Sequence, residues 1–135
     1  MTQPTQAGDF SLLHKQQYAN LFTFRKSGAA VKTPIWFAEQ GGKLYVMTVQ
    51  DSGKIKRIRN NGKVLIGPSD QRGTPLGPTV EARARLLDPD TEEARLAKTL
   101  LDRKYGFLKA VFDLFGTLSG SKRAWIEIAP AEGQA

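Results

Sequence analysis

The chain has 135 residues, of which 40% are hydrophobic and 24% are charged, and its formal net charge is +7. This length and composition are typical of one globular domain and exclude a disordered or fibrous chain. The absence of cysteine excludes disulfides, thiolate metal sites and thiol nucleophiles, and no stretch approaches the ~20 apolar residues of a membrane span.

Residues 1–9 are expected to form a flexible N-terminus, residues 10–130 a single domain and residues 131–135 a tail. The first nine residues lack the basic and apolar regions of a signal peptide, so we expect a cytoplasmic protein. The charge is unevenly distributed, because residues 15–63 hold ten Lys and Arg against two acids. An anionic partner is therefore expected to meet the first half of the chain.

The first predicted element is a short amphipathic helix at residues 9–18, DFSLLHKQQY. Three strands joined by tight turns follow it, at residues 18–25, 31–39 and 44–49. The third of these strands, LYVMTV, is apolar on both faces, so both faces must be covered. Pro34 lies inside the second strand and cannot donate a ladder hydrogen bond, which predicts an edge or bulge there.

A short helix at residues 52–61 comes next, with Ser52 at its N-cap, and two more strands at 64–70 and 78–87 follow. In the second of these, small side chains at alternate positions suit a tight barrel interior. The strongest helix signal is DPDTEEARLAKTLLDRKYG, with Asp90 or Thr91 as cap. A second, apolar helix is predicted at 107–118 and a last strand at 122–129. Six strands joined mostly by tight turns imply an antiparallel barrel with helices over its openings.

The basic helix is the main functional signal. At about 100° per residue, Ile55 and Ile58 form its buried face. Two cationic pairs flank that face, with Lys54 and Arg57 on one side and Lys56 and Arg59 on the other. A phosphate at the N-terminus would meet the Ser52 hydroxyl, free amides and the Lys54 flank together. Three alternatives are open from this spacing: solvated charges, a phosphate site and a nucleic-acid site.

The nucleic-acid alternative rests on aromatic side chains in the strands, as in oligonucleotide-binding barrels that stack bases. These side chains are Tyr18, Phe22, Phe24, Trp36 and Tyr45. Two observations speak against it. The strands TPIWFA and LYVMTV are too apolar for an exposed groove, and the cations cluster at one helix rather than along a track.

Four stretches of the chain resemble the split-barrel flavin and deazaflavin oxidoreductases related to pyridoxamine 5′-phosphate oxidase, and in particular the F-420-dependent branch. They are YANLFTFRKSGAAVKTPIWFA, GKLYVMTVQDSGKIKRIRNN, SDQRGTPLGPTVEARARLL and AWIEIAP, which run in the family's order from Tyr18 to Pro130. The resemblance implies a mainly β fold with helices, a six-stranded antiparallel split β-barrel of the FMN-binding type. It also implies a homodimer with a cofactor groove at the interface.

Carried over position by position, the resemblance implies a cofactor phosphate at Ser52, Gly53 and Lys54, supported by Arg57. The ring system would lie along the second and third strands. The implied ring contacts are Thr33, Pro34, Ile35, Trp36, Thr48 and Val49, with Trp125 in the last strand as a looser candidate. No metal site is expected, and no catalytic residue is assigned.

The leading hypothesis is an oxidoreductase that transfers a hydride between coenzyme F-420 and an unidentified small organic substrate. In such an enzyme the cofactor carries the chemistry, which suits a chain with one histidine and no obvious acid–base pair. The anionic tail of F-420 would use the surplus cations at Lys56, Arg59 or Lys63. The nearest alternative is the same fold with FMN. An alternative of another class is a non-catalytic module that binds a cofactor or single-stranded nucleic acid.

Overall fold

The structure is a computed structural model, and it describes residues 5–7, 10–49, 52–106 and 123–131. Its strands are β1 (Thr5–Ala7), β2 (Tyr18–Phe24), β3 (Ala30–Trp36), β4 (Ala38–Gln40), β5 (Lys43–Val49), β6 (Lys63–Ser69), β7 (Thr79–Leu87) and β8 (Arg123–Pro130). Its helices are the 3-10 turn η1 (Ser11–Leu13), α1 (Gly53–Asn60) and α2 (Glu92–Tyr105). The apolar helix predicted at 107–118 lies outside the described residues.

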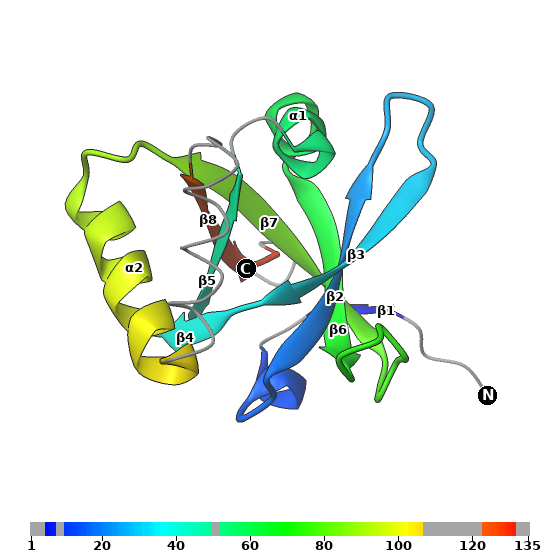
Figure 1. Ribbon diagram of the computed structural model, residues 1–135. Helices are drawn as coiled ribbons and strands as arrows, with labels where there is room; N and C mark the ends of the chain where they lie inside the picture. Colours follow the sequence, from blue (N-terminus) through cyan, green and yellow to red (C-terminus); the bar gives the residue numbers. More distant parts are fainter. Residues whose placement is uncertain (1–4, 8–9, 50–51, 107–122, 132–135) are drawn as a thin grey trace.

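The strands form one sheet in the order β3-β2-β6-β7-β8-β5-β4, and every neighbouring pair on this path is antiparallel. The two ends of the path, β3 and β4, follow one another in the chain, and no ladder joins them among the described residues. Within these residues, β4 pairs only with residues 43–45 of β5, so the rest of β5 is also an open edge. The sheet therefore curls into a barrel that stays split between β3 and this part of β5 (Figure 1). This confirms the predicted split-barrel class.

The strand count differs from the predicted six, because the strand expected at 31–39 is two strands separated by Phe37. The Phe37 amide donates to Tyr105 Oη at 2.8 Å, and the same hydroxyl lies 2.9 Å from the Phe37 carbonyl oxygen. Since the Phe37 amide is bonded to this side chain, Phe37 joins no ladder, and the chain passes from pairing with β2 to pairing with β5. The short strand β1, which pairs in parallel with β7, was also not predicted.

Buried apolar side chains form two clusters on the two faces of the sheet. The first fills the barrel, with Leu44 and Val46 of β5 inside it, and Ile55 and Ile58 of α1 close its upper end (Figure 1). The second lies between the outer face of β5, β7 and β8 and the helix α2. This explains why β5 is apolar on both faces, as the sequence predicted, because one face packs in the barrel and the other under α2.

The amphipathic helix predicted at residues 9–18 is wrong, because only the single turn η1 forms. Phe10 and Leu13 lie on one face of that turn and are both buried against the barrel, so one turn suffices to bury them. The turn ends at His14, whose ψ of 128° is extended, and Lys15 then takes a left-handed backbone conformation with φ of 67°. The chain enters β2 three residues later.

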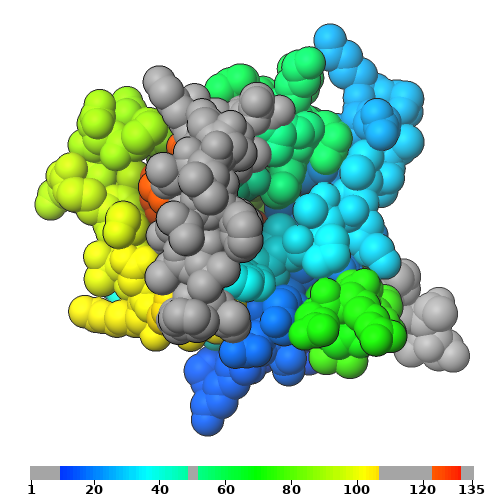
Figure 2. Space-filling view, in the orientation of Figure 1, coloured from blue at the N-terminus to red at the C-terminus, as the bar shows by residue number. Residues whose placement is uncertain are grey.

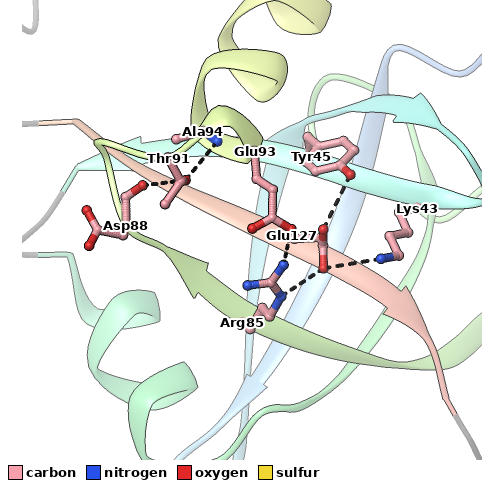
Figure 3. Close-up of polar contacts among 8 residues, drawn as sticks. All are labelled: Lys43, Tyr45, Arg85, Asp88, Thr91, Glu93, Ala94 and Glu127. Carbon is pink, nitrogen blue, oxygen red and sulfur yellow. Dashed lines mark hydrogen bonds and ion pairs between the residues drawn. The ribbon is translucent and has the colours of Figure 1, made fainter.

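Helix α2 begins as predicted at Thr91, which is its N-cap. Thr91 Oγ1 accepts a hydrogen bond from the Ala94 amide and donates to the Asp88 carbonyl oxygen (Figure 3). Its first turn holds two acids and its last turn two bases, which complements the helix dipole. Within the described ranges, no helix has both the length and the apolar composition that a membrane crossing requires.

Candidate functional site

The predicted phosphate site lies where β5 ends and α1 begins. The Arg57 side chain folds back over the first turn of α1, and its Nε donates to Thr23 Oγ1 of β2 at 2.6 Å. A Cβ at position 53 would lie only 2.7 Å from Arg57 Nη1, so glycine at this position leaves room for the guanidinium. In Figure 2 the green surface of α1 adjoins the blue surface of the β2–β3 hairpin. Arg57 is thus held by two elements.

Hydroxyl groups line the same corner. Thr48, the inward-facing residue near the end of β5, is buried, and its Oγ1 lies 3.5 Å from Ser52 Oγ. Ser52 occupies the N-cap position, as predicted, but its side chain makes no capping hydrogen bond. Within the described residues, no cap side chain therefore accepts from the amides of the first turn of α1, which are the donors that a helix N-terminus offers to an anion.

Lys54 is half-buried beside Arg57. Burial, and then the neighbouring Arg57 charge, lower the pKa of the Lys54 ammonium below its ordinary value. Among the described residues neither cation forms an ion pair with an acid. Two like charges that face each other in a partly dry corner are stabilised by an anion between them. The corner therefore fits a phosphate group in both charge and hydrogen-bond donors.

The residues predicted to contact a ring divide between two faces of the sheet. Ile35 is buried in the barrel and Thr33 shares its face, so these two lie on the same side as Thr48. Pro34 and Trp36 point to the opposite face of β3. Pro34 is exposed on the edge strand, as predicted, and Trp36 stacks on Tyr105 of α2 at 4.6 Å between ring centroids.

Trp125 is not brought to the inner face that carries Thr48. It is buried under α2 in the outer cluster, and its neighbour across the ladder is Met47. Val49 pairs with Arg123 at the end of the same ladder, next to α1. The structure thus joins Thr48, Ser52, Gly53, Lys54 and Arg57 in one corner and leaves Trp125 on the other side of the sheet.

Comparison with protein families gives one match, to the model described as pyridoxamine 5′-phosphate oxidase, which covers residues 10–135. The chain belongs to this family. A comparison with curated proteins finds no match. For a member of the pyridoxamine 5′-phosphate oxidase family, the split barrel and its open seam are the expected architecture.

Solved structures support the same fold. HutZ, the heme storage protein from Vibrio cholerae, superposes with a TM-score of 0.70 at 15% identity, over 90% of this chain and 87% of that one. A structure described as F420 reductase gives 0.56 at 25% identity, over 92% and 94%. A pyridoxamine 5′-phosphate oxidase-related, FMN-binding protein from Nostoc punctiforme gives 0.59 at 14% identity, over 84% and 70%.

A charged cluster that no sequence pattern predicted lies on the outer face of the sheet, centred on Glu127 of β8. Glu127 is buried, with Arg85 of β7 directly opposite on one side and Tyr45 of β5 on the other. Its carboxylate accepts from Arg85 Nε at 2.9 Å and from Tyr45 Oη at 3.3 Å, and lies 3.8 Å from Lys43 Nζ (Figure 3). Arg85 also pairs with Glu93 of α2.

Arg85 is partly exposed, but its main partner is this buried carboxylate. The signal was a single acid at an alternate position of the apolar strand AWIEIA. Burial of the Tyr45 phenol, and then the negative charge of Glu127, raise the pKa of Tyr45. The phenol therefore stays a neutral donor to the carboxylate.

A cavity of about 810 Å³ lies at the other end of the barrel from α1, and contains none of the predicted site residues. It is open to solvent and is bordered by η1, the β4–β5 hairpin and the last turn of α2, which lie together at the lower end of Figure 1. We call it the basal cavity. The described residues contain no group of three or more His, Asp or Glu that could hold a metal ion.

The ammonium of Lys104, which lines the basal cavity, predicts how the free energy of unfolding depends on pH. Its ammonium lies 3.8 Å above the Phe37 ring and donates to the Gln16 carbonyl oxygen. Burial lowers the pKa of Lys104 to about 8 from 10.5, although Glu39 partly raises it. An unfolded chain therefore binds more protons than the folded one above pH 8, and the free energy of unfolding should rise with pH from about 8 to 10.

Urea denaturation of the wild type and of Lys104→Met at pH 7.5 and 9.5 measures this contribution. We expect the wild type to gain more stability between the two pH values than the variant does. Tyr105, whose pKa is raised by burial, opposes this trend only above its ordinary value of 10.0. Equal pH slopes in the two proteins would show that Lys104 is not desolvated.

Proposed function

We propose that the chain binds a flavin-type cofactor by its phosphate at the start of α1 and acts as an oxidoreductase, which transfers a hydride between coenzyme F-420 and a small organic substrate. The observation that supports this most is the pair Lys54 and Arg57, which share a partly buried corner with no acid paired to them in the described residues. The F420 reductase structure, at 25% identity over nearly the whole chain, favours the deazaflavin.

In this proposal each residue of the corner has a binding role. Lys54 and the amides of the first turn of α1 hold the phosphate, and Ser52 supplies a hydroxyl. Arg57 adds a second positive charge, and the hydrogen bond from its Nε to Thr23 fixes the guanidinium in place. Gly53 keeps the space that the guanidinium occupies. The cofactor supplies the hydride chemistry, and the protein supplies position and charge.

The seam between β3 and β5 is the proposed place for the ring. Thr33 and Ile35 line it from β3 and Thr48 from β5, and all three share the inner face of the sheet. Because Pro34 has no amide hydrogen and β3 is an edge strand, this edge is not extended by a further strand in the described residues. We propose that a second copy of the chain completes the groove, as the family resemblance implies.

FMN is the alternative cofactor, and the FMN-binding neighbour from Nostoc punctiforme supports it. Both molecules carry a phosphate, so the corner at α1 serves either. They differ in the tail, since F-420 continues beyond the phosphate with further anionic groups. Lys56, Arg59 and Lys63 are exposed at and after α1 and could meet such a tail.

Titration of the purified protein with F-420 and with FMN, followed by cofactor fluorescence, tests the proposal. We expect a dissociation constant below roughly 100 μM for at least one of them, and a lower value for F-420. Single-stranded DNA is the control ligand. Binding of neither cofactor, together with DNA binding that weakens steeply with salt, would overturn the oxidoreductase proposal.

A further inference from the structure

We propose that the basal cavity is a second ligand site, which binds a small organic anion with an apolar body. The cavity is built by three elements that are far apart in the chain, η1, the β4–β5 hairpin and the end of α2. Its volume of about 810 Å³ lies within the roughly 300–1,000 Å³ of pockets that hold small molecules.

The charge of the lining favours an anion. Lys15, Lys43, Arg103 and Lys104 line the cavity against one carboxylate, Glu39. Glu39 lies 3.5 Å from the imidazole of His14, and Lys43 is shared with Glu127 outside the cavity. Lys15, Arg103 and Lys104 therefore supply the positive charge that a ligand would meet.

The floor of the cavity is apolar, which sets the kind of anion. Phe10, Leu44 and Leu100 are all buried and all line it. A bare phosphate or sulfate would leave this apolar surface in contact with water. An aryl or alkyl carboxylate, sulfonate or phosphate would cover the floor with its apolar part and place its charge among the cations at the rim.

The backbone of Lys15 is a second, independent observation. Among the described residues it is the only one other than glycine with a positive φ, at 67°. This conformation is costly for a lysine and is tolerated best by Gly, Asn and Asp. The chain thus keeps a cation at a position where backbone energetics favour another residue, and that cation lines the cavity.

This site is separate from the cofactor corner. Strand β5 connects the two, with Lys43 at the cavity and Thr48 next to α1 (Figure 1). Thr48 is five positions after Lys43, which along an extended strand is a distance of roughly 16 Å. The two sites share no residue, so a ligand in the basal cavity and a phosphate at α1 can be tested independently.

The probe for the test is 1-anilinonaphthalene-8-sulfonate, an apolar anion whose fluorescence rises in a dry environment. We expect saturable binding at one site per chain. Lys15→Asn should weaken it roughly three- to fivefold, the scale of one charge partly screened by solvent. Asparagine tolerates the left-handed backbone, so this variant removes the charge without adding strain, and its thermal midpoint should not fall.

Lys26→Asn is the matched control, since Lys26 lies exposed in the β2–β3 turn and its loss changes the net charge equally. It should leave probe affinity unchanged. Arg103→Gln should weaken the probe as Lys15→Asn does, and both variants should keep wild-type affinity for FMN or F-420. Unsaturable probe binding, or equal affinity of Lys15→Asn and Lys26→Asn, would overturn the second site without touching the cofactor proposal.

Discussion

Lys54→Ala should weaken cofactor binding by about 1.5–3 kcal/mol, or roughly 10- to 150-fold. The reason is that Lys54 is half-buried and lies beside Arg57, so a phosphate there makes a charge-assisted hydrogen bond in a partly dry site. Removal of the ammonium leaves one side of the phosphate with a weaker partner. Fluorescence titration with FMN and with F-420 measures the change.

Lys56→Ala is the control for Lys54→Ala. Lys56 lies on the opposite flank of α1 and is exposed, and its loss changes the net charge by the same amount. We expect it to leave FMN binding nearly unchanged. If the Lys54 and Lys56 variants weaken FMN equally, the effect is one of overall charge, and Lys54 is not a phosphate ligand.

Arg85→Met should destabilise the fold by about 2–3 kcal/mol. Glu127 is 4% exposed, and Arg85 is its nearest cation, with Lys43 farther away at 3.8 Å. Removal of one partner from a buried ion pair costs roughly 3–5 kcal/mol, because the remaining charge stays desolvated. The expected value is lower because the Arg85 side chain is 52% exposed, and the pair is therefore partly screened by water.

Arg83→Met is the control for the Arg85 variant, since Arg83 is exposed two residues away on the same face of β7. It should change stability by less than about 0.5 kcal/mol. The double variant Arg85→Met with Glu127→Leu should recover most of the loss, because an apolar pair needs no counter-charge. Urea denaturation of the four proteins gives the comparison. A loss in Arg85→Met no greater than in Arg83→Met would contradict the role assigned to the pair.

The sequence predicted the strands well because the alternation of side chains reports burial directly. In β7, for example, Val80, Ala82 and Ala84 alternate with charged residues and all three are buried in the barrel. The break at Phe37 was not predictable in this way. It depends on the hydroxyl of Tyr105, 68 residues away, and no local pattern contains that contact.

The same distinction, between residues close in the chain and residues far apart in it, separates the corner at α1 from the basal cavity. The corner at α1 was predictable because Ser52, Lys54 and Arg57 lie within one and a half turns of one helix, so helical geometry alone places them together. What sequence could not show is the support from Thr23, which comes from a distant strand. The basal cavity was missed entirely, since three separate elements meet to form it.

Trp125 shows a third limit of predicting site residues from the sequence. The resemblance to the family suggested it as a ring contact, but the ladder between β5 and β8 places it on the outer face, under α2. Thr48 lies on the inner face of the same ladder, opposite Ala124. Because neighbours along a strand point to opposite faces, one ring on the inner face cannot contact both.

The most direct measurement is a crystal structure of the protein with bound FMN or F-420. We expect the cofactor phosphate within hydrogen-bonding distance of Lys54 Nζ and of the first amides of α1, with the ring along the seam of β3 and β5. A phosphate bound elsewhere, for example in the basal cavity, or a corner at α1 that is filled by the chain's own side chains or by a partner subunit, would contradict the account.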